Sequence, residues 1–329
     1  MQKLIISLIT IFISMFIVFF VIYYMPGDPV EILAQEIIRQ ENLPYYVAYQ
    51  RAITTLNYNP DEPIISQLST YLKGIVSGDL GYSLTYQKPV IEVIAQALPW
   101  TLLILGVALV ISFIIGVLIG AYLALKASAK LNIKLLIYQS VFGAVPDYIV
   151  AYILIFIFSV TLKWLPSKGA YTSSVTVGFN LPFIVDVAKH ATLPVLAYFL
   201  TTVSTWIVNM RANAVTVMGE EYITYAVIRG LPKKTMLIHY LGKNSILPMI
   251  SNLAVAFGMM FGGSPLIENL FLYPGVGYYL NIAINRRDFP LMQGMFFVMI
   301  IMLIMSNLIA EYVGQILNPR LKGESYDDF

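Results

Sequence analysis

The feature that most constrains this chain is a set of long apolar runs. The first, LIISLITIFISMFIVFFVIYYM at 4–25, holds 22 residues without a charge. A helix needs about 20 such residues to cross the hydrocarbon core of a bilayer. The apolar region of a signal peptide has only about 7–15 residues and precedes a small-residue cleavage site, which this run lacks. We therefore predict a retained membrane-spanning helix.

Five further windows are long and apolar enough to span a membrane. Hydrophobic residues make up 58% of the sequence and charged residues 12%, against about 45–50% and about 25% in soluble domains. Lipid offers backbone amides no partner, so each span is expected to be a helix. The third window is expected to tilt or to break near Pro146. We predict one all-α transmembrane domain over 1–329, with spans at about 4–25, 100–125, 135–162, 190–210, 246–270 and 292–317.

The basic residues are concentrated on one side of these spans. With six spans both termini share that side, which carries eleven Lys and Arg but only five acidic residues. The other side carries nine basic and eleven acidic residues over a greater length. Because Lys and Arg are enriched in cytoplasmic loops, we predict a multi-pass protein of the cell membrane with both termini and the loop 211–245 in the cytoplasm.

The segment 26–99 then lies outside the cytoplasm. Two of its stretches, VEILAQEIIRQ at 30–40 and PIISQLSTYLKGIVS at 63–77, repeat apolar residues at helical spacing. We predict short helices lying over the outer mouth of the spans. The chain contains no cysteine, which excludes disulfides and thiolate metal sites. No metal site is expected.

The stretch 220–248, EEYITYAVIRGLPKKTMLIHYLGKNSILP, is a polar insertion between two predicted spans. Two carboxylates open it, where a helix dipole favours anions. Gly230 is placed to end a helix in the left-handed conformation, and Pro232 suits the first turn of the next helix. We predict two short helices joined at a Gly-Leu-Pro corner. Helical spacing places four residues on one face of the first helix: Tyr222, Tyr225, Ala226 and Arg229.

This stretch resembles the loop shared by the permease subunits of ABC importers, and most closely the version of the dipeptide/oligopeptide branch. Five elements of that branch's loop match without a gap: Glu221-Tyr222, Ala226, Gly230-Leu231, Asn244 and Leu247-Pro248. Thr224 and Tyr225 occupy the places of the general family's Glu-Ala, and Arg229 stands where Asp or Lys is usual. The docking contacts are therefore expected to differ in detail.

The resemblance continues in order along nearly the whole chain. A basic loop alone is common, and each further segment alone is weak, since a Pro-Gly-Asp-Pro is usually a turn after a helix. Six segments in register identify the chain as resembling this family. They are YYMPGDPVEIL (23–33), GIVSGDLGYSLTYQKPVIEVIAQALPWTLLI (74–104), WLPSKGA (164–170), HATLPVLA (190–197), NLFLYPGVGYYLNIAINRRDFPLMQG (269–294) and ILNPRL (316–321).

The resemblance implies a type I ABC importer permease (MetI-like) fold with a cytoplasmic coupling helix. It implies a non-catalytic subunit with no cofactor of its own, because ATP and Mg²⁺ are bound by two partner ATPase subunits. The chain itself has no G-x-x-x-x-G-K-[ST] phosphate loop. The other implied partners are a homologous second permease, an extracytoplasmic solute-binding protein and membrane lipid, with no nucleic acid. The implied ATPase-coupling residues are Glu221, Tyr222, Tyr225, Ala226, Arg229, Gly230 and Leu231.

Ionisable and small residues within the spans indicate a translocation path. Asp147 and Glu311 are the ionisable residues assigned to spans, and such residues are usually functional in membranes. Asp147 either lines the path or caps a helix that restarts after Pro146. Glu311 is expected to pair with another side chain or to reach the membrane–water interface. Small residues of the fifth span either line the path or pack helices closely. The candidate path residues are Asp147, Gly258, Met259, Gly262 and Ser264.

Two polar, turn-rich segments, 74–84 and 273–290, flank the predicted outer mouth. A binding protein has to dock there to release its ligand, and Asp79, Arg286 and Arg287 are the candidate docking residues. The alternative is that both arginines pair with Asp288 or with lipid phosphate.

The predicted function is the transmembrane pathway of an ATP-driven importer for dipeptides or oligopeptides that works by alternating access. One alternative is the same type of importer carrying oligosaccharides. A second is an ion-coupled secondary transporter, which needs a midplane cluster of ionisable residues that Asp147 alone does not supply. A third is a membrane enzyme, but His190 and His239 are far apart and show no catalytic or metal-ligand spacing.

Overall fold

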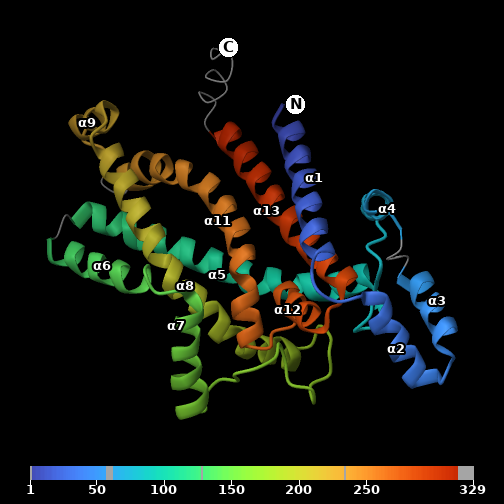
Figure 1. The fold of residues 1–329 in the computed structure, drawn as a ribbon. Helices are drawn as coiled ribbons and strands as arrows, with labels where there is room; N and C mark the ends of the chain where they lie inside the picture. The colour runs from blue at the N-terminus through green and yellow to red at the C-terminus, as the bar shows by residue number, and fades with distance from the viewer. Residues whose placement is uncertain (1, 57–61, 127–128, 233–234, 318–329) are drawn as a thin grey trace. The chain divides into compact units, whose positions relative to one another are not determined.

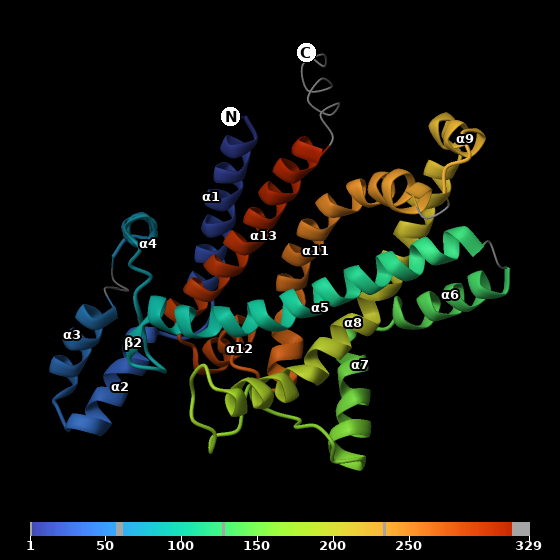
Figure 2. The same cartoon turned by 180° about the vertical axis from the view of Figure 1, so that it is seen from behind.

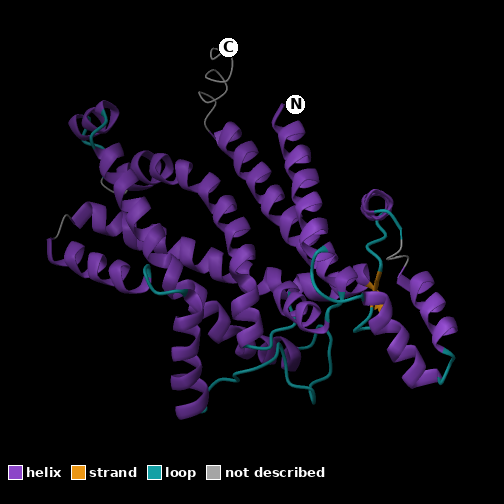
Figure 3. Cartoon of the chain, viewed as in Figure 1, coloured by secondary structure: helices purple, strands orange, loops and turns teal. Residues whose placement is uncertain are grey.

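The computed structural model describes residues 2–56, 62–126, 129–232 and 235–317. Helices joined by loops make up most of this part of the chain (Figure 3). Its contacts group into two compact units: unit 1 is Met1–Thr101 with Tyr273–Ile304, and unit 2 is Leu102–Leu272 with Met305–Phe329. Each unit is described by itself, and the expectation of a single domain stays a prediction.

Unit 1 contains the short helices of the segment that follows the first span. Its elements are α1 (Gln2–Tyr23), α2 (Pro29–Glu41), α3 (Tyr45–Leu56), α4 (Ile64–Ser77), β1 (Tyr82–Ser83), β2 (Lys88–Pro89), α12 (Val276–Arg286) and the first parts of α5 (Val90–Lys126) and α13 (Phe289–Leu317) (Figure 1). The two strands pair antiparallel, with Tyr82 opposite Pro89.

Unit 2 contains the remaining long helices and two π-helical segments. Its elements are α6 (Ala129–Phe142), α7 (Asp147–Leu154), η1 (Ile155–Thr161), α8 (Leu181–Met218), α9 (Glu221–Ile228), η2 (Met236–Gly242), α11 (Lys243–Leu270) and the remaining parts of α5 and α13 (Figure 2).

The long apolar windows are helices, as the sequence predicts. Five helices of the described residues are long and apolar enough to cross a membrane, or six if a bent pair counts as one span. Only 17% of the most apolar window of α1 is buried, so its remaining apolar side chains are available to lipid. The bent pair, Ile133–Phe142 with Asp147–Thr161, turns by 92°. Pro146, which cannot donate to a helix ladder, lies at this bend, so the predicted break is confirmed.

Two helices begin before the spans predicted within them. Helix α5 starts at Val90 rather than near 100 and carries Pro99 within it. Helix α8 starts at Leu181 rather than near 190, because Asn180 caps it: the Asn180 side-chain oxygen accepts from the Phe183 N–H at 2.9 Å. Capping residues and polar first turns extend these helices beyond the apolar windows from which the spans were predicted.

Short helices also occupy the segment between the first two spans, as predicted. Asp28 caps α2 through a 2.8 Å bond from the Val30 N–H, and Pro29 suits the first helical position. Helices α2 and α3 pack on each other through a small apolar core that includes Val30, Ala34 and Ala48. The expectation that 273–290 is only turn-rich is wrong, because Val276–Arg286 forms helix α12.

In unit 2 the backbones of α5 and α8 approach closely. A Cβ built on Gly116 would lie 2.3 Å from the Trp206 Cβ, and one on Gly120 would lie 2.6 Å from the Ile207 carbonyl oxygen. Only glycine fits at such a crossing, which is the packing mode expected between membrane helices. Around it Leu109, Trp206 and Met249 join α5, α8 and α11 in one apolar core.

Candidate functional site

The polar insertion of unit 2 forms the predicted corner. Helix α9 ends at Ile228, and Gly230, two residues further on, is left-handed with φ +68°. The Gly230 N–H donates to the Val227 carbonyl at 2.9 Å, and the Leu231 N–H donates to the Ala226 carbonyl at 3.2 Å. These two bonds define a Schellman turn, so the predicted helix end is confirmed. A Cβ on Gly230 would meet no atom within 4 Å, and therefore the need for glycine is conformational, not steric.

Beyond the corner the chain returns directly to a span. Residues 233 and 234 lie outside the described residues, and the Met236 N–H donates to the Pro232 carbonyl at 3.1 Å. Helix η2 then runs into α11 without a gap. The predicted second helix is thus confirmed as an element, but it is a π-helix continuous with the fifth span. This continuity joins the corner mechanically to α11.

The two faces of α9 differ in exposure. Ile223 and Ala226 are buried, at 8% and 2% exposed, and α9 packs against η2. The hydroxyl of Tyr222 accepts a 3.0 Å bond from the Asn244 amide. Ala226 therefore lies against its own chain, on the opposite side of α9 from the exposed Tyr225, and its part in ATPase coupling stays a prediction. Helical spacing showed which residues are neighbours but not which side packs inward.

The outward face of α9 is unusually apolar for a polar loop. Tyr225, Val227 and Ile228 are exposed, Ile228 to 75%, and α9 protrudes beyond the end of α8 in both views (Figures 1 and 2). Glu221 and Arg229 are also exposed, and Leu231 is half-buried. A contiguous exposed apolar surface rimmed by charge is typical of a protein interface.

The predicted path residues are only partly brought together. Gly263, on α11, lies near Asp147: a Cβ built there would be 3.9 Å from the Asp147 Oδ2. Gly262 faces open space and Met259 is 69% exposed. Gly258 and Ser264 are buried, and the Ser264 hydroxyl donates to the Phe261 carbonyl of its own helix. Ser264 and Gly258 thus pack helices, whereas Asp147, Met259 and Gly262 remain accessible.

Sequence reasoning missed two polar residues near Asp147. Glu268 is fully buried in α11, and Tyr198 of α8 is 2% exposed. Helices α7, α8 and α11 pack on one another, and Asp147 and Glu268 both act electrostatically on the Tyr198 hydroxyl. Glu268 was visible as a carboxylate within the fifth apolar window, but its place near the end of that window made it look like a loop residue.

In unit 1 the three docking candidates are exposed: Asp79, Arg286 and Arg287. Asp79 accepts a 3.0 Å bond from the Gly81 N–H. Arg287 is left-handed, with φ +56°, and its guanidinium lies over Gly27, where a Cβ would come within 2.8 Å of the Arg287 Nη1.

Asp288 does not pair with these arginines; it binds other parts of unit 1. It is fully buried, and its Oδ2 accepts from the Ser83 hydroxyl at 2.6 Å and from the Thr85 N–H at 2.8 Å. Its Oδ1 accepts from the Leu291 N–H at 3.2 Å, which caps α13. The alternative that Asp288 neutralises Arg286 and Arg287 is therefore wrong, because its oxygens are occupied and turned inward.

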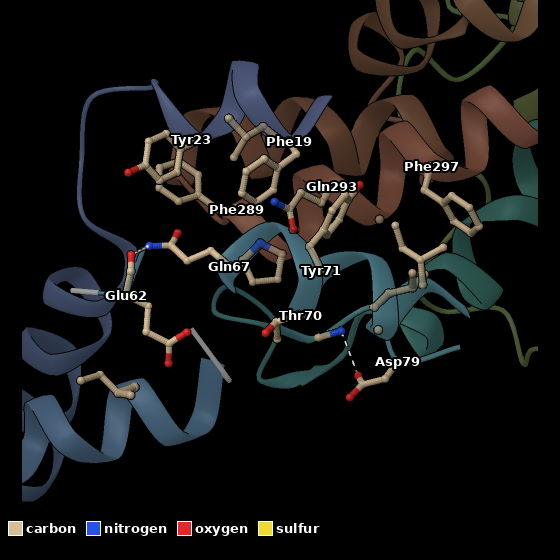
Figure 4. Close-up of a pocket in the computed structure, with 18 of the residues that line it drawn as sticks. Phe19, Tyr23, Glu62, Gln67, Thr70, Tyr71, Asp79, Phe289, Gln293 and Phe297 are labelled. Carbon is tan, nitrogen blue, oxygen red and sulfur yellow. Dashed lines mark hydrogen bonds between the residues drawn. The ribbon is translucent and has the colours of Figure 1, made fainter. Parts of the chain in front are cut away.

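Unit 1 also holds a cavity of about 370 Å³ beside the segment that contains Asp79. Its walls come from α1, α4 and the start of α13, and aromatic rings including Phe19, Tyr71 and Phe297 surround it (Figure 4). Burial raises the pKa of Tyr71 to about 12, so its hydroxyl is neutral at physiological pH. The cavity is mainly apolar, with the amides of Gln67 and Gln293 among its polar groups.

The histidines contribute no site that the structure shows. His190 of α8 is buried, with its Nδ1 2.9 Å from the Asp186 carbonyl oxygen, and the His239 side chain lies outside what the structure describes. Within the described residues no group of three or more His, Asp and Glu could hold a metal ion.

Long apolar helices, one of them bent, and an exposed corner continuous with α11 are features of a helical membrane protein. Over residues 116–323 the sequence matches the family "binding-protein-dependent transport system inner membrane component". The chain belongs to this family of ABC importer permeases, whose fold is the type I, MetI-like one.

Named relatives cover nearly the whole chain. It is 26% identical to the glutathione transport system permease protein GsiC of Escherichia coli O6:H1, over 98% of both chains. It is 27% identical to the oligopeptide transport system permease protein AppB of Bacillus subtilis, over 90% of both. It is 25% identical to a putative peptide permease protein of Brucella ovis, over 98% of both.

Proposed function

We propose that this chain forms half of the translocation pathway of an ATP-driven importer for dipeptides and oligopeptides. Substrate passes from an extracytoplasmic binding protein to the cytoplasm by alternating access. Membership in the importer family and the peptide and glutathione names of three full-length relatives support this substrate class. None of these three names favours the oligosaccharide alternative.

The observation that carries the proposal is the exposed apolar surface at the tip of α9. Tyr225 and Ile228 stand beside the Schellman turn at Gly230, and this surface docks on a cytoplasmic ATPase. Glu221, Tyr222, Arg229 and Leu231 flank it, whereas Ala226 and Gly230 act by shaping the turn. Because η2 continues into α11, movement of the ATPase is passed to a membrane-spanning helix.

The partners are a homologous second permease and two ATPase subunits, which bind ATP and Mg²⁺. This chain contributes no catalytic group to hydrolysis. An affinity-tagged copy purified from its native membrane should bring down one further permease and two ATPase chains. Recovery of the chain alone, under conditions that preserve its helical content, would contradict this assembly.

Transport is tested with the recovered complex in liposomes that contain ATP. Uptake of a labelled peptide should require both ATP and the binding protein. A complex that accumulates a labelled oligosaccharide but no peptide from a mixed peptide pool would overturn the peptide assignment while keeping the importer.

The binding protein docks on the exposed surface of unit 1 that carries Asp79, Arg286 and Arg287. The cavity beside this surface receives an apolar side chain from the binding protein. Such a side chain would displace water from the aromatic walls of the cavity. This arrangement requires unit 1's short helices to face outward and both termini to be cytoplasmic.

Topology has a direct test, because the chain contains no cysteine. Val76 of α4 is 89% exposed and Ile228 of α9 is 75% exposed, so each accepts a cysteine without repacking. Val76→Cys should react with an impermeant thiol reagent in intact cells, and Ile228→Cys only after permeabilisation. Labelling of both in intact cells would contradict the orientation.

A further inference from the structure

Residues 162–180 form the loop that joins η1 to α8 within unit 2 (Figure 2). This loop exposes large apolar side chains: Trp164 is 69% exposed, Val177 is 63% exposed and Phe179 is fully exposed. Leu181, the first residue of α8, is exposed as well. Several such side chains in one segment indicate a surface that another molecule or a membrane covers.

The loop is held in a defined shape, so the exposure belongs to its fold. The Gly169 N–H donates to the Phe271 carbonyl at the end of α11 at 2.8 Å. The Thr172 N–H and hydroxyl donate to the two carboxylate oxygens of Asp186 on α8, at 2.6 Å and 3.0 Å. Between these anchors Ala170 is buried. Trp164 and Phe179 therefore project from a loop that is attached to two membrane helices.

Both ends of the loop continue an apolar surface of the spans. Before Trp164, on η1, Phe156 and Val160 are exposed. After Phe179, on α8, Ile184 is exposed as well as Leu181. The bent span and α8 are both candidate membrane spans, so their exposed apolar side chains are available to lipid. The loop thus lies where the lipid-facing surface of two spans ends.

The charges of the loop suit the boundary of a bilayer. Residues 162–180 contain two lysines and no carboxylate, and both Lys163 and Lys168 are exposed. The nearby carboxylate of Asp186 is engaged by Thr172. Tryptophan is enriched where membrane meets water, and basic residues beside Trp, Phe and Leu are typical of segments that lie in this boundary. Lipid supplies both acyl chains for the apolar side chains and phosphates for the lysines.

We propose that the 162–180 loop lies in the headgroup–acyl boundary of the bilayer, which is the outer leaflet in the proposed topology. Trp164 and Phe179 insert among the acyl chains, and Lys163 and Lys168 contact lipid phosphates. The loop thereby holds the ends of η1 and α8 at a fixed depth in the membrane. This inference uses the membrane location of the chain and holds for any transported molecule.

The cysteine-free chain allows the depth of the loop to be measured with single spin labels. Phe179→Cys and Val177→Cys, each labelled with a nitroxide, are compared in the complex reconstituted into liposomes that contain phosphatidylglycerol. Phe156→Cys is the reference for lipid, and Val76→Cys, which the proposed topology exposes to water, is the aqueous reference. At 177 and 179, collisions with oxygen should exceed collisions with a water-soluble nickel reagent, as at 156, and the reverse should hold at 76.

Three outcomes decide what covers the loop. Access to oxygen above access to nickel at 177 and 179 supports insertion into lipid. Access to nickel above access to oxygen would show that the loop is in water and overturn the proposal. Low access to both reagents would show that a protein, such as the second permease, covers the loop, and would also overturn it. ATPase activity of each labelled complex confirms that the variant is assembled.

The contact of the lysines with phosphate has its own test. Replacing phosphatidylglycerol by phosphatidylcholine should move the label at 179 toward water, because the membrane surface loses its negative charge. In a chain that also carries Lys163→Gln and Lys168→Gln, the depth at 179 should no longer depend on the lipid. The same depth in both kinds of liposome with both lysines present would overturn this contact.

Discussion

Helices α9 and α12 end in the same kind of turn, and the two turns are built differently. At the end of α9, Gly230 is left-handed, and Leu231 bonds back to Ala226. At the end of α12, Arg287 is left-handed, and the Asp288 N–H bonds back to the Ala283 carbonyl at 2.9 Å. Both are Schellman turns. The first uses the residue type suited to it, whereas the second holds an arginine in a conformation that costs a non-glycine residue about 1–2 kcal/mol.

The second turn tolerates this strain because the next residue is fixed on several sides. Asp288 is buried and accepts hydrogen bonds from Ser83, Thr85 and Leu291. The first turn has no such support, and Gly230 is exposed. The α12 turn is thus held by contacts inside unit 1, whereas the α9 turn is exposed, as the proposed contact with an ATPase requires.

The largest expected effect is at Asp288. Asp288→Ala leaves three hydrogen-bond donors without their acceptor and removes the cap of α13, so we expect a loss of roughly 3 kcal/mol of stability. Thermal unfolding of the purified protein in detergent measures it. Asp79→Ala, at an exposed carboxylate that accepts one such bond, should change stability far less. Equal losses of thermal stability in the two variants would show that Asp288 does not stabilise the turn at the end of α12.

The next effect is at Gly230. Gly230→Val disfavours the left-handed turn by about 1–2 kcal/mol, and we expect a complex that assembles poorly or hydrolyses ATP without transport. Gly230→Asn is the matched control, because asparagine tolerates this conformation better. Uptake and ATPase activity of the reconstituted complex report the result. If ATP hydrolysis stays coupled to uptake in the valine variant, docking of the ATPase does not depend on the shape of this turn.

The smallest effect distinguishes the two neighbouring arginines. Arg286 is exposed, whereas Arg287 also covers Gly27. Arg286→Glu should weaken stimulation of ATPase activity by the binding protein, since an exposed ion pair contributes about 0.2–1 kcal/mol. Arg287→Glu should in addition lower the thermal stability of the isolated chain. If stimulation keeps its wild-type concentration dependence in both variants, neither arginine contacts the partner.

Much of the fold follows from the sequence, because membrane helices are specified by runs of apolar residues. The break at Pro146 and the left-handed end at Gly230 also follow from single residues with strong backbone preferences. Helix α12 was missed although Val276, Leu280 and Ala283, all buried, repeat at helical spacing. The flanking Pro274-Gly275 and Arg286-Arg287 led to the prediction of a turn.

The candidate sites were less predictable, because they depend on which faces pack inward. Spacing placed Ala226 beside Tyr225, but only packing of α9 on η2 shows that Ala226 is buried. Tyr198 carried no signal at all, since a tyrosine in an apolar helix is ordinary. The role of Asp288 required a contact with Ser83, 205 residues away in the chain.

The glycine crossing of α5 and α8 has a consequence for how unit 2 can deform. With Gly116 and Gly120 pressed against the turn of α8 at Trp206 and Ile207, neither helix can rotate about its own axis without a steric clash. Helices α5 and α8 are therefore expected to move together as one rigid body. Any change of shape within unit 2 then has to occur in other elements. At the bend between Phe142 and Asp147, a Cβ built on Gly143 would meet only Gln139 of its own turn, so we expect this bend to move more easily than the α5–α8 crossing.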